Sequence, residues 1–159
     1  MKNFLLVATG MAAGSILTVV VLINVFPSMM IETKESRYSL DKTVEMIDMN
    51  SIEQGWAVVK VWDLGRRIAG AGYDDAPRVK VMELCHAENT YNVLKNEDDM
   101  FVSAIMPCRM AVFEKENGKT FVSRMNIGLM SRFFSDNVRN VMKGVAEDDQ
   151  RMLENIIGE

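Results

Sequence analysis

Residues 108–125, CRMAVFEKENGKTFVSRM, contain two short runs of largely alternating apolar and polar residues separated by a turn. The turn includes Asn117 and Gly118, and an Asn-Gly pair between two such runs is the strongest short-range signal for a β-hairpin. The sequence therefore predicts strands over 108–115 and 120–125. Because segments with helical periodicity flank this hairpin on both sides, the pattern predicts an α+β fold.

Further elements are predicted outward from the hairpin. Toward the C-terminus the apolar period becomes helical, which predicts a long helix from residue 126 with a break near Ser135 or Gly144. Toward the N-terminus, Ser39 is suited to begin a helix and Gly55 to end it. The other predicted elements are strands over 56–62, 79–85 and 101–106, a helical turn from Asp63 to Gly70, and a short helix over 87–95.

The N-terminal region is dominated by a run from Phe4 to Phe26 that contains no charged residue and no histidine. About 20 apolar residues in a helix cross the ~30 Å hydrocarbon core of a bilayer, so this run predicts a transmembrane helix. Lys2 precedes the run and Glu32 is the first charged residue after it, which favours an internal N-terminus and an exported domain. The predicted organisation is a transmembrane signal anchor over 1–26, a juxtamembrane linker over 27–38, and a domain over 39–159 on the periplasmic or extracellular side of an inner membrane.

A cleaved signal peptide is the alternative interpretation of this run. Such a peptide has an apolar core of about 7–15 residues followed by a small-x-small cleavage site. Here the apolar run continues past Ala12, Ala13 and Gly14 to Phe26. The length of the run therefore favours a retained anchor.

Gly10 and Gly14 form a G-x-x-x-G spacing within the predicted span. In a membrane helix this spacing permits the close approach of a second helix, and it predicts helix packing at these two residues. Glycine is also common in membrane helices for other reasons. The spacing by itself leaves both interpretations open.

The composition argues against two classes of function. The chain has a net charge of −4 and no basic stripe, so nucleic-acid binding is not expected. It has one histidine, no C-x-x-C motif and no glycine-rich phosphate loop, and therefore no recognisable catalytic motif. The carboxylate pairs are interpreted as solvated charges: Asp74-Asp75, Asp98-Asp99 and Asp148-Asp149. We therefore do not predict an enzyme.

Several segments of the chain resemble one family. These segments are Gly55-Trp56-Ala57-Val58-Val59, Val81-Met82-Glu83-Leu84-Cys85, Met106-Pro107-Cys108-Arg109-Met110-Ala111-Val112-Phe113-Glu114 and Asn117-Gly118. Over roughly residues 39–157 the chain is similar to the family named domain of unknown function 302. The resemblance implies a small, mainly antiparallel sheet backed by helices, and often a homodimer. Where family members are expected to have Cys-Asn-Pro, this chain has Cys85, His86 and Ala87, which places a potential ligand in the position of an amide.

The candidate site consists of Cys85, His86 and Cys108, which are both cysteines and the single histidine of the chain. Cys85 ends one predicted strand and Cys108 begins another, so their sulfur atoms are expected at one edge of the sheet. One interpretation is a structural disulfide closing a loop of about 22 residues, which would contribute ~3 kcal/mol. A second is a pair of buried free thiols that behave as small apolar groups.

A third interpretation is a cofactor site for haem or a soft metal such as copper. His86 is the best single ligand, and Met106, Met110 or Met125 would supply a thioether. The predicted cofactor-binding residues are Cys85, His86, Cys108 and Met110, of which His86, Cys85 and Cys108 are the predicted metal ligands. The chain has 14 methionines, and methionine also fills gaps in ordinary cores.

Two functions from different classes follow. The first is a membrane-anchored binding domain that holds a small ligand, haem or metal near Cys85, His86 and Cys108 in an envelope redox or sulfur pathway. The second is a non-catalytic accessory subunit whose helix packs through Gly10 and Gly14 into a larger membrane complex. The predicted partners are membrane lipid along residues 4–26, a second copy of the chain, or subunits of a membrane complex.

Overall fold

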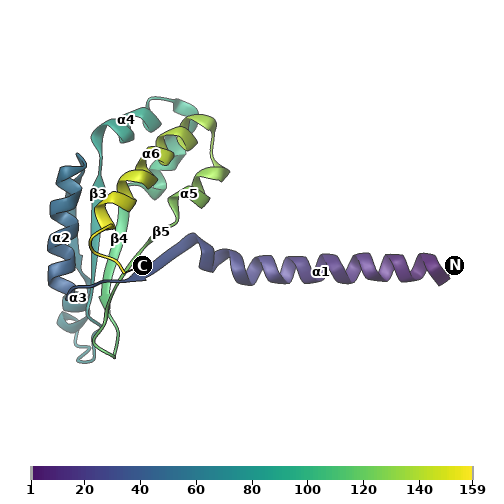
Figure 1. The fold of residues 1–159 in the computed structure, drawn as a ribbon, viewed down its shortest axis with the longest axis horizontal. Coiled ribbons are helices and arrows are strands. Elements are labelled where there is room, and N and C mark those ends of the chain that lie inside the picture. Colours follow the sequence, from purple (N-terminus) through teal and green to yellow (C-terminus); the bar gives the residue numbers. More distant parts are fainter. Residues whose placement is uncertain (1, 159) are drawn as a thin grey trace.

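The computed structural model of the chain describes residues 2–158, and the side chains of residues 2–9, 12 and 13 lie outside this description. The centre of the fold is a five-stranded antiparallel sheet of order β1-β5-β4-β3-β2 (Figure 1). Its strands are β1 (Ile31–Glu35), β2 (Ala57–Asp63), β3 (Val79–Cys85), β4 (Cys108–Glu114) and β5 (Thr120–Met125). The expected α+β fold with an antiparallel sheet backed by helices is confirmed.

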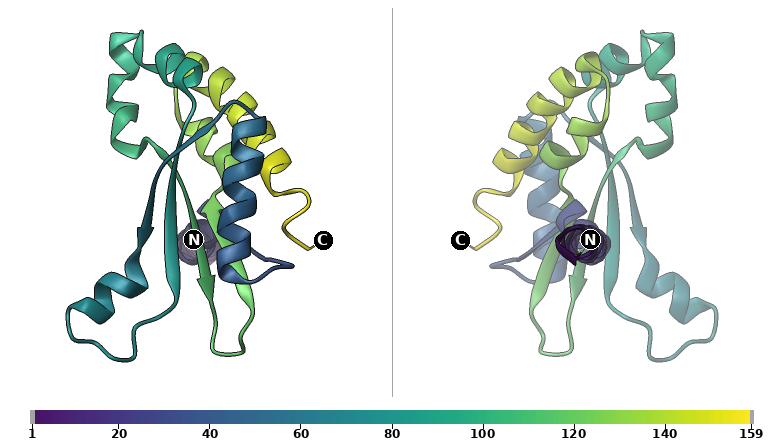
Figure 2. Two further views of the ribbon diagram at one scale, coloured as in Figure 1. Left: turned by 90° about the vertical axis from the view of Figure 1, so that its left-hand side faces the viewer. Right: turned by 90° about the vertical axis from the view of Figure 1, so that its right-hand side faces the viewer.

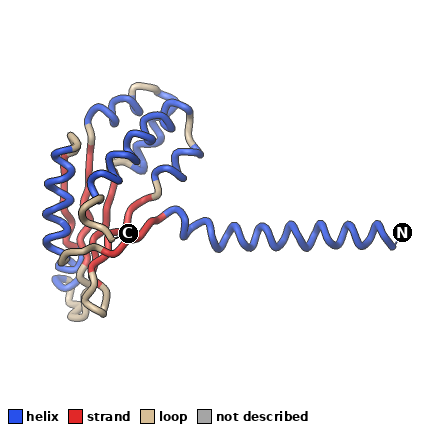
Figure 3. The backbone as a smooth tube through the Cα atoms, viewed as in Figure 1, coloured by secondary structure: helices blue, strands red, loops and turns tan. Residues whose placement is uncertain are grey.

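Helices cover one face of this sheet and gather at one end of it. The two longest in the domain, α2 (Leu40–Glu53) and α6 (Asp136–Leu153), lie side by side (Figure 2). The short helices that directly follow β3 lie at the end of the sheet where β3 stops, whereas the short helix that follows β2 lies at the opposite end (Figure 3). The remaining helices are α1 (Lys2–Met30), α3 (Leu64–Gly70), α4 (Ala87–Leu94), the 3-10 helix η1 (Glu97–Ile105), α5 (Ile127–Met130) and the 3-10 helix η2 (Ser131–Phe133).

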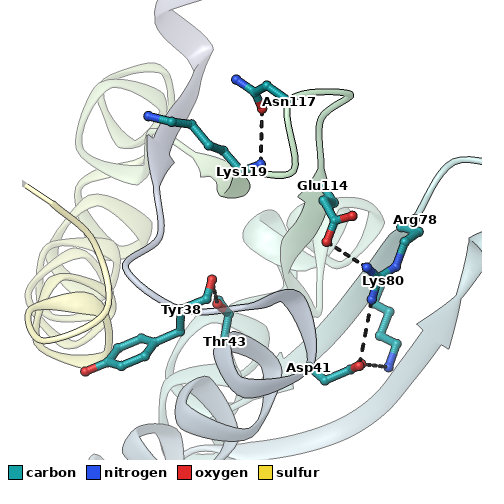
Figure 4. A network of polar contacts seen from close by, with 8 residues as sticks. All are labelled: Tyr38, Asp41, Thr43, Arg78, Lys80, Glu114, Asn117 and Lys119. Atoms are coloured by element: carbon teal, nitrogen blue, oxygen red, sulfur yellow. Dashed lines mark hydrogen bonds and ion pairs between the residues drawn. The ribbon is translucent and has the colours of Figure 1, made fainter.

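The hairpin predicted from residues 108–125 is present as β4 and β5. Gly118 has φ of 76°, a left-handed conformation that glycine adopts without strain. The side chain of Asn117 accepts a hydrogen bond from the backbone N–H of Lys119 at 3.1 Å (Figure 4). Local turn chemistry therefore fixes the register of the strand pair, in which Glu114 faces Thr120 and Met110 faces Arg124.

The core follows the period of two along the strands. Met82 and Leu84 of β3, and Val112 of β4, are at most 1% exposed. They pack against Ile47 of α2 and Met152 of α6, which are also fully buried. Each such side chain contributes about 1.5–3 kcal/mol on complete burial, so this single layer between sheet and helices is the main source of stability.

An ion-pair network joins the start of α2 to the sheet. Lys80 of β3 and Asp41 of α2 are 2.7 Å apart, and Arg78 lies 2.7 Å from Glu114 and 3.9 Å from Asp41 (Figure 4). The hydrogen bond and charge of Lys80 lower the pKa of Asp41 below its ordinary value. Asp41 and Arg78 are 69% and 58% exposed, so the network positions α2 more than it stabilises the fold.

Two predicted segments differ from the structure. Residues 31–35, within the predicted linker 27–38, instead form the edge strand β1 paired with β5. The predicted strand over 101–106 is wrong, because residues 97–105 form η1. Both edges of β4 are already paired with β3 and β5, so no edge was left there for another strand. In η1 Val102 is buried, whereas Phe101 and Ile105 are exposed.

The helix α1 projects away from the domain (Figure 1). Within the described part of the chain, no helix combines the length and the apolar character needed to cross a membrane. The predicted span over 4–26 includes residues 4–9, 12 and 13, whose side chains lie outside the described residues. Around Gly10 and Gly14 of α1, an added Cβ would meet no atom within 4 Å among the residues described.

Candidate functional site

Cys85, His86 and Cys108 lie together at the end of the sheet where β3 stops and β4 begins. Cys85 is the last residue of β3, and Cys108 faces Leu84 across the ladder between β3 and β4. Both cysteines are free thiols and partly buried. Strand ends therefore bring the three predicted site residues into one region, as their positions in the sequence suggest.

His86 acts locally as the N-cap of α4. Its Nδ1 accepts a hydrogen bond from the backbone N–H of Asn89 at 3.3 Å. Its ring contacts Trp56 edge to face at 5.5 Å, and a Cβ added to Gly55 would lie 3.3 Å from its Nε2. One ring nitrogen is therefore used by the helix and the other lies against a tight turn.

The thiols and His86 do not form a metal-binding cluster with other ligands. Among the described residues, no three side chains of His, Cys, Asp or Glu come together in a way that suits a metal ion. Met110 is 4% exposed and belongs to the core. A haem or copper site at Cys85, His86, Cys108 and Met110 stays a prediction, and this arrangement does not favour it.

A cavity of about 750 Å³ occupies this end of the domain, between the sheet and the helices α4, η1 and α6. Its walls are mainly apolar, with a small number of polar groups among them. The residues that line it include Trp56, Leu84, Val93, Val102, Ile105, Met106, Met110, Met125, Val141 and Val145, together with Cys85, His86, Cys108, Arg124 and Asp149. A void of this size and character suits a small organic molecule.

The main charged group of this cavity is a buried ion pair between Asp149 of α6 and Arg124 of β5. Only about an eighth of each side chain is exposed: 13% of Asp149 and 12% of Arg124. A second nitrogen of Arg124 donates to Glu32 of β1 at 3.0 Å. Burial raises the pKa of Asp149 from 3.8 to about 6, Arg124 opposes this rise, and the charge of Glu32 adds to it.

Cys108 lies beside this pair, and its thiol is not activated. Burial raises the pKa of its thiol from 9.0 to about 11, and the charges of Asp149 and Cys85 act in the same direction. A thiol with this pKa remains protonated at neutral pH, whereas nucleophiles and metal ligands are thiolates. The cysteine therefore serves as part of the cavity wall.

A family model matches residues 32–159, and it is described as domain of unknown function DUF302. The chain belongs to the DUF302 family. The match begins seven residues before the predicted domain start at Ser39, and it includes all but the first residue of β1.

A crystal structure of an uncharacterized conserved DUF302 protein from Bacillus stearothermophilus has the same fold as this DUF302 chain. The TM-score is 0.71 at 16% sequence identity, and the alignment covers 80% of this chain and 98% of the other. At this identity the likeness establishes the fold alone. No curated protein matches the chain.

Sequence reasoning missed the charged residues of this DUF302 cavity. The interpretation of Asp148-Asp149 as solvated is wrong for Asp149, which is 9% exposed. The sequence contains a signal for the burial of Asp149, because this residue falls between Val145 and Met152 at helical spacing on the apolar stripe of α6. Likewise Arg124 follows Val122 on the core-facing side of β5.

Proposed function

We propose that this DUF302 domain is a non-catalytic binding domain for a small, predominantly apolar molecule. The observation that supports it is the cavity of about 750 Å³, which has apolar walls and one buried ion pair. Ligand pockets in proteins have volumes of about 300–1,000 Å³ and this same combination of apolar lining with few polar groups.

The chemistry of the lining residues favours binding over catalysis. The thiol of Cys108 has a raised pKa, and one ring nitrogen of His86 is used as the cap of α4. Asp149 is paired with Arg124. These groups would position and orient a ligand, and they supply no activated nucleophile.

The test is uptake of a neutral fluorescent apolar probe, N-phenyl-1-naphthylamine, by the full-length protein. We expect saturable fluorescence enhancement in the wild type. Ala104 is an exposed residue of η1 at the cavity, so Ala104→Trp should fill the space and weaken the probe's affinity by about tenfold or more. Ala71→Trp is the matched control, because Ala71 is exposed and lies outside the cavity lining. Equal affinity in both variants would contradict the proposal.

We also infer that α1 anchors the domain to an inner membrane through residues 4–26, with the domain on the periplasmic or extracellular side. This is supported by the uncharged sequence of that segment and by the exposed large apolar side chains along α1, including Leu17, Val21 and Leu22. A bilayer would cover these side chains, which are otherwise costly to expose to water.

Membrane flotation of the full-length protein after an alkaline wash tests this anchor. The double variant Leu17→Lys, Val21→Lys should move to the soluble fraction, because each central lysine costs about 2.5–3.5 kcal/mol in a membrane helix. Met49→Lys, Val59→Lys is the control with the same added charge on exposed residues of the domain. A wild-type protein that is released by the wash would overturn the inference.

A second candidate function is that of an accessory subunit held in a membrane complex by α1. It is supported by the open space beside Gly10 and Gly14, where a second helix backbone could approach. Gly14→Leu should then release a partner that co-purifies in mild detergent, while Ile16→Leu on the same helix should retain it. Retention of the partner by both variants would argue against packing at the glycines.

A further inference from the structure

The charged groups around the cavity do not balance. Arg124 is shared between Asp149 and Glu32, and Arg109, at the cavity, is paired with Glu83 at 3.0 Å. Two guanidinium groups of the cavity lining therefore pair with three carboxylates, and of these three Asp149 alone lines the cavity. The pairs leave a surplus of one negative charge, and it lies where Asp149, which is buried, and Glu32, whose side chain is 39% exposed, share one arginine.

One oxygen of Asp149 has no partner. Oδ2 accepts from Arg124, whereas no donor within the described residues reaches Oδ1. Among those residues, no buried side-chain nitrogen or oxygen is left both sealed and unpaired, so Oδ1 must be accessible. Asp149 is 9% exposed and is one of the residues that line the cavity, so the cavity provides a route to its carboxylate.

Both arginines of the cavity are already paired with carboxylates. Both terminal nitrogens of Arg124 already donate to carboxylates, and Arg109 donates to Glu83 through Nε and a terminal nitrogen. An anionic ligand would meet guanidinium groups that are already neutralised and would add to the surplus negative charge. A cationic ligand would meet an acceptor without a donor.

We infer that the cavity binds an organic cation, an apolar molecule whose protonated amine donates a hydrogen bond to Oδ1 of Asp149. This inference rests on the proposed function and names the class of ligand. The apolar body of the ligand would pack against Val93, Val102 and Val145, which line the same cavity. Its ammonium group would complete the hydrogen bonding of Asp149 and offset the unbalanced charge.

The test compares three probes that share one alkyl chain, namely octylamine, 1-octanol and octanoate, at pH 7.5. Binding is followed by the fluorescence of Trp56, which lines the cavity, in a Trp62→Phe background that leaves one tryptophan. We expect octylamine to bind about tenfold or more tightly than octanoate, with 1-octanol between them. Equal binding of all three probes, or tightest binding of octanoate, would overturn the inference and leave the binding function standing.

Matched variants test whether Asp149 is the group that recognises the protonated amine. Asp149→Asn keeps the shape of the side chain and should reduce the preference for octylamine to about twofold or less. Glu147→Gln, an exposed change of equal charge on the same helix, should leave it unaltered. If circular dichroism shows that Asp149→Asn does not fold, Glu32→Gln removes the surplus charge from the edge strand and should also reduce the preference.

Failure of the inference is distinguishable from failure of the proposed function. If no octyl probe binds but N-phenyl-1-naphthylamine does, the cavity takes an apolar ligand without cation recognition. If neither the octyl probes nor N-phenyl-1-naphthylamine bind, the proposed function itself is wrong. A preference for octylamine that survives in Asp149→Asn would also overturn the assignment.

Discussion

Two buried aspartates, Asp99 of η1 and Asp149 of α6, use the same side chain for different purposes. Each is the second residue of an Asp-Asp pair, and they are 2% and 9% exposed. The carboxylate of Asp99 accepts three hydrogen bonds of 2.7–2.8 Å, from Ser135, Asn137 and Asn96. The carboxylate of Asp149 is held by Arg124 alone, and Arg124 also serves Glu32.

The pKa values of the two carboxyl groups shift in opposite directions. Hydrogen bonds from Ser135 and Asn137 lower the pKa of Asp99 below 3.8. Burial and the charge of Glu32 raise that of Asp149 to about 6. A carboxylate that is fully supplied with donors is a structural clamp, whereas one with an open oxygen in a cavity is suited to meet a ligand. Burial alone does not separate the two roles.

The largest expected effect comes from removing the clamp. Asp99→Ala should lower the melting temperature by roughly 5 °C or more, because it leaves the side chains of Ser135, Asn137 and Asn96 without their acceptor. Asp98→Ala should change it little, since Asp98 is exposed. Thermal unfolding followed by circular dichroism measures both. Equal stability of the two variants would mean that η1 is held by Val102 and its apolar contacts instead.

The next largest effect is on the pH dependence of stability. The contributions of the two carboxyl groups to stability change with pH in opposite directions. The folded pKa of Asp149 is raised, so the native state binds its proton more tightly between pH 3.8 and about 6. Its contribution to stability is complete at low pH and declines by about 2–3 kcal/mol as the pH rises through that interval. For Asp99 the contribution is present at neutral pH and is lost as the pH falls below its ordinary pKa.

Urea unfolding between pH 3.5 and pH 7 measures this difference. The stability of the wild type minus that of Asp149→Asn should fall as the pH rises. The stability of the wild type minus that of Asp99→Asn should increase as the pH rises. Two curves of the same slope would show that the residues do not differ in their protonation. The comparison of each variant with the wild type cancels the titration of the other carboxyl groups.

The smallest expected effect is on the neighbouring thiol. The charge of Asp149 is the second cause of the raised pKa of Cys108, after burial. Asp149→Asn should therefore increase the rate of Cys108 alkylation at pH 8.5 by only about two- to fivefold. Mass spectrometry after iodoacetamide treatment, in a Cys85→Ser background, measures this rate. An unchanged rate would show that burial alone protects the thiol.

Much of the fold could be predicted because its signals are local. The hairpin at Asn117 and Gly118, the strand over 79–85 and the cap at Asp63 all depend on residues close in sequence, and the structure contains them. The strand β1 was missed because it lies at the edge of the sheet, exposes most of its side chains and has no apolar alternation. Its existence depends on pairing with β5, about 90 residues away.

The candidate site could be predicted only in part, because some of its residues come together from distant parts of the sequence. Strand ends suggested that Cys85 and Cys108 lie together, which requires only the order of adjacent strands. The group Glu32, Arg124 and Asp149 comes from β1, β5 and α6, and it forms only when a missed edge strand and a helix meet at the hairpin. Asp99 was misjudged because its donors Ser135 and Asn137 lie in the loop and helix that follow the hairpin.

The helix α1 is joined to the sheet without an intervening loop. Met30 ends α1, the next residue, Ile31, begins β1, and Ile31 lies in the cavity wall. The carbonyl of Met30 accepts from the backbone N–H of Asn126, and Phe26 contacts Phe133 edge to face at 5.6 Å, so the joint is braced from two directions. Because no loop separates α1 from β1, a change in the direction of the helix would move a residue of the cavity wall.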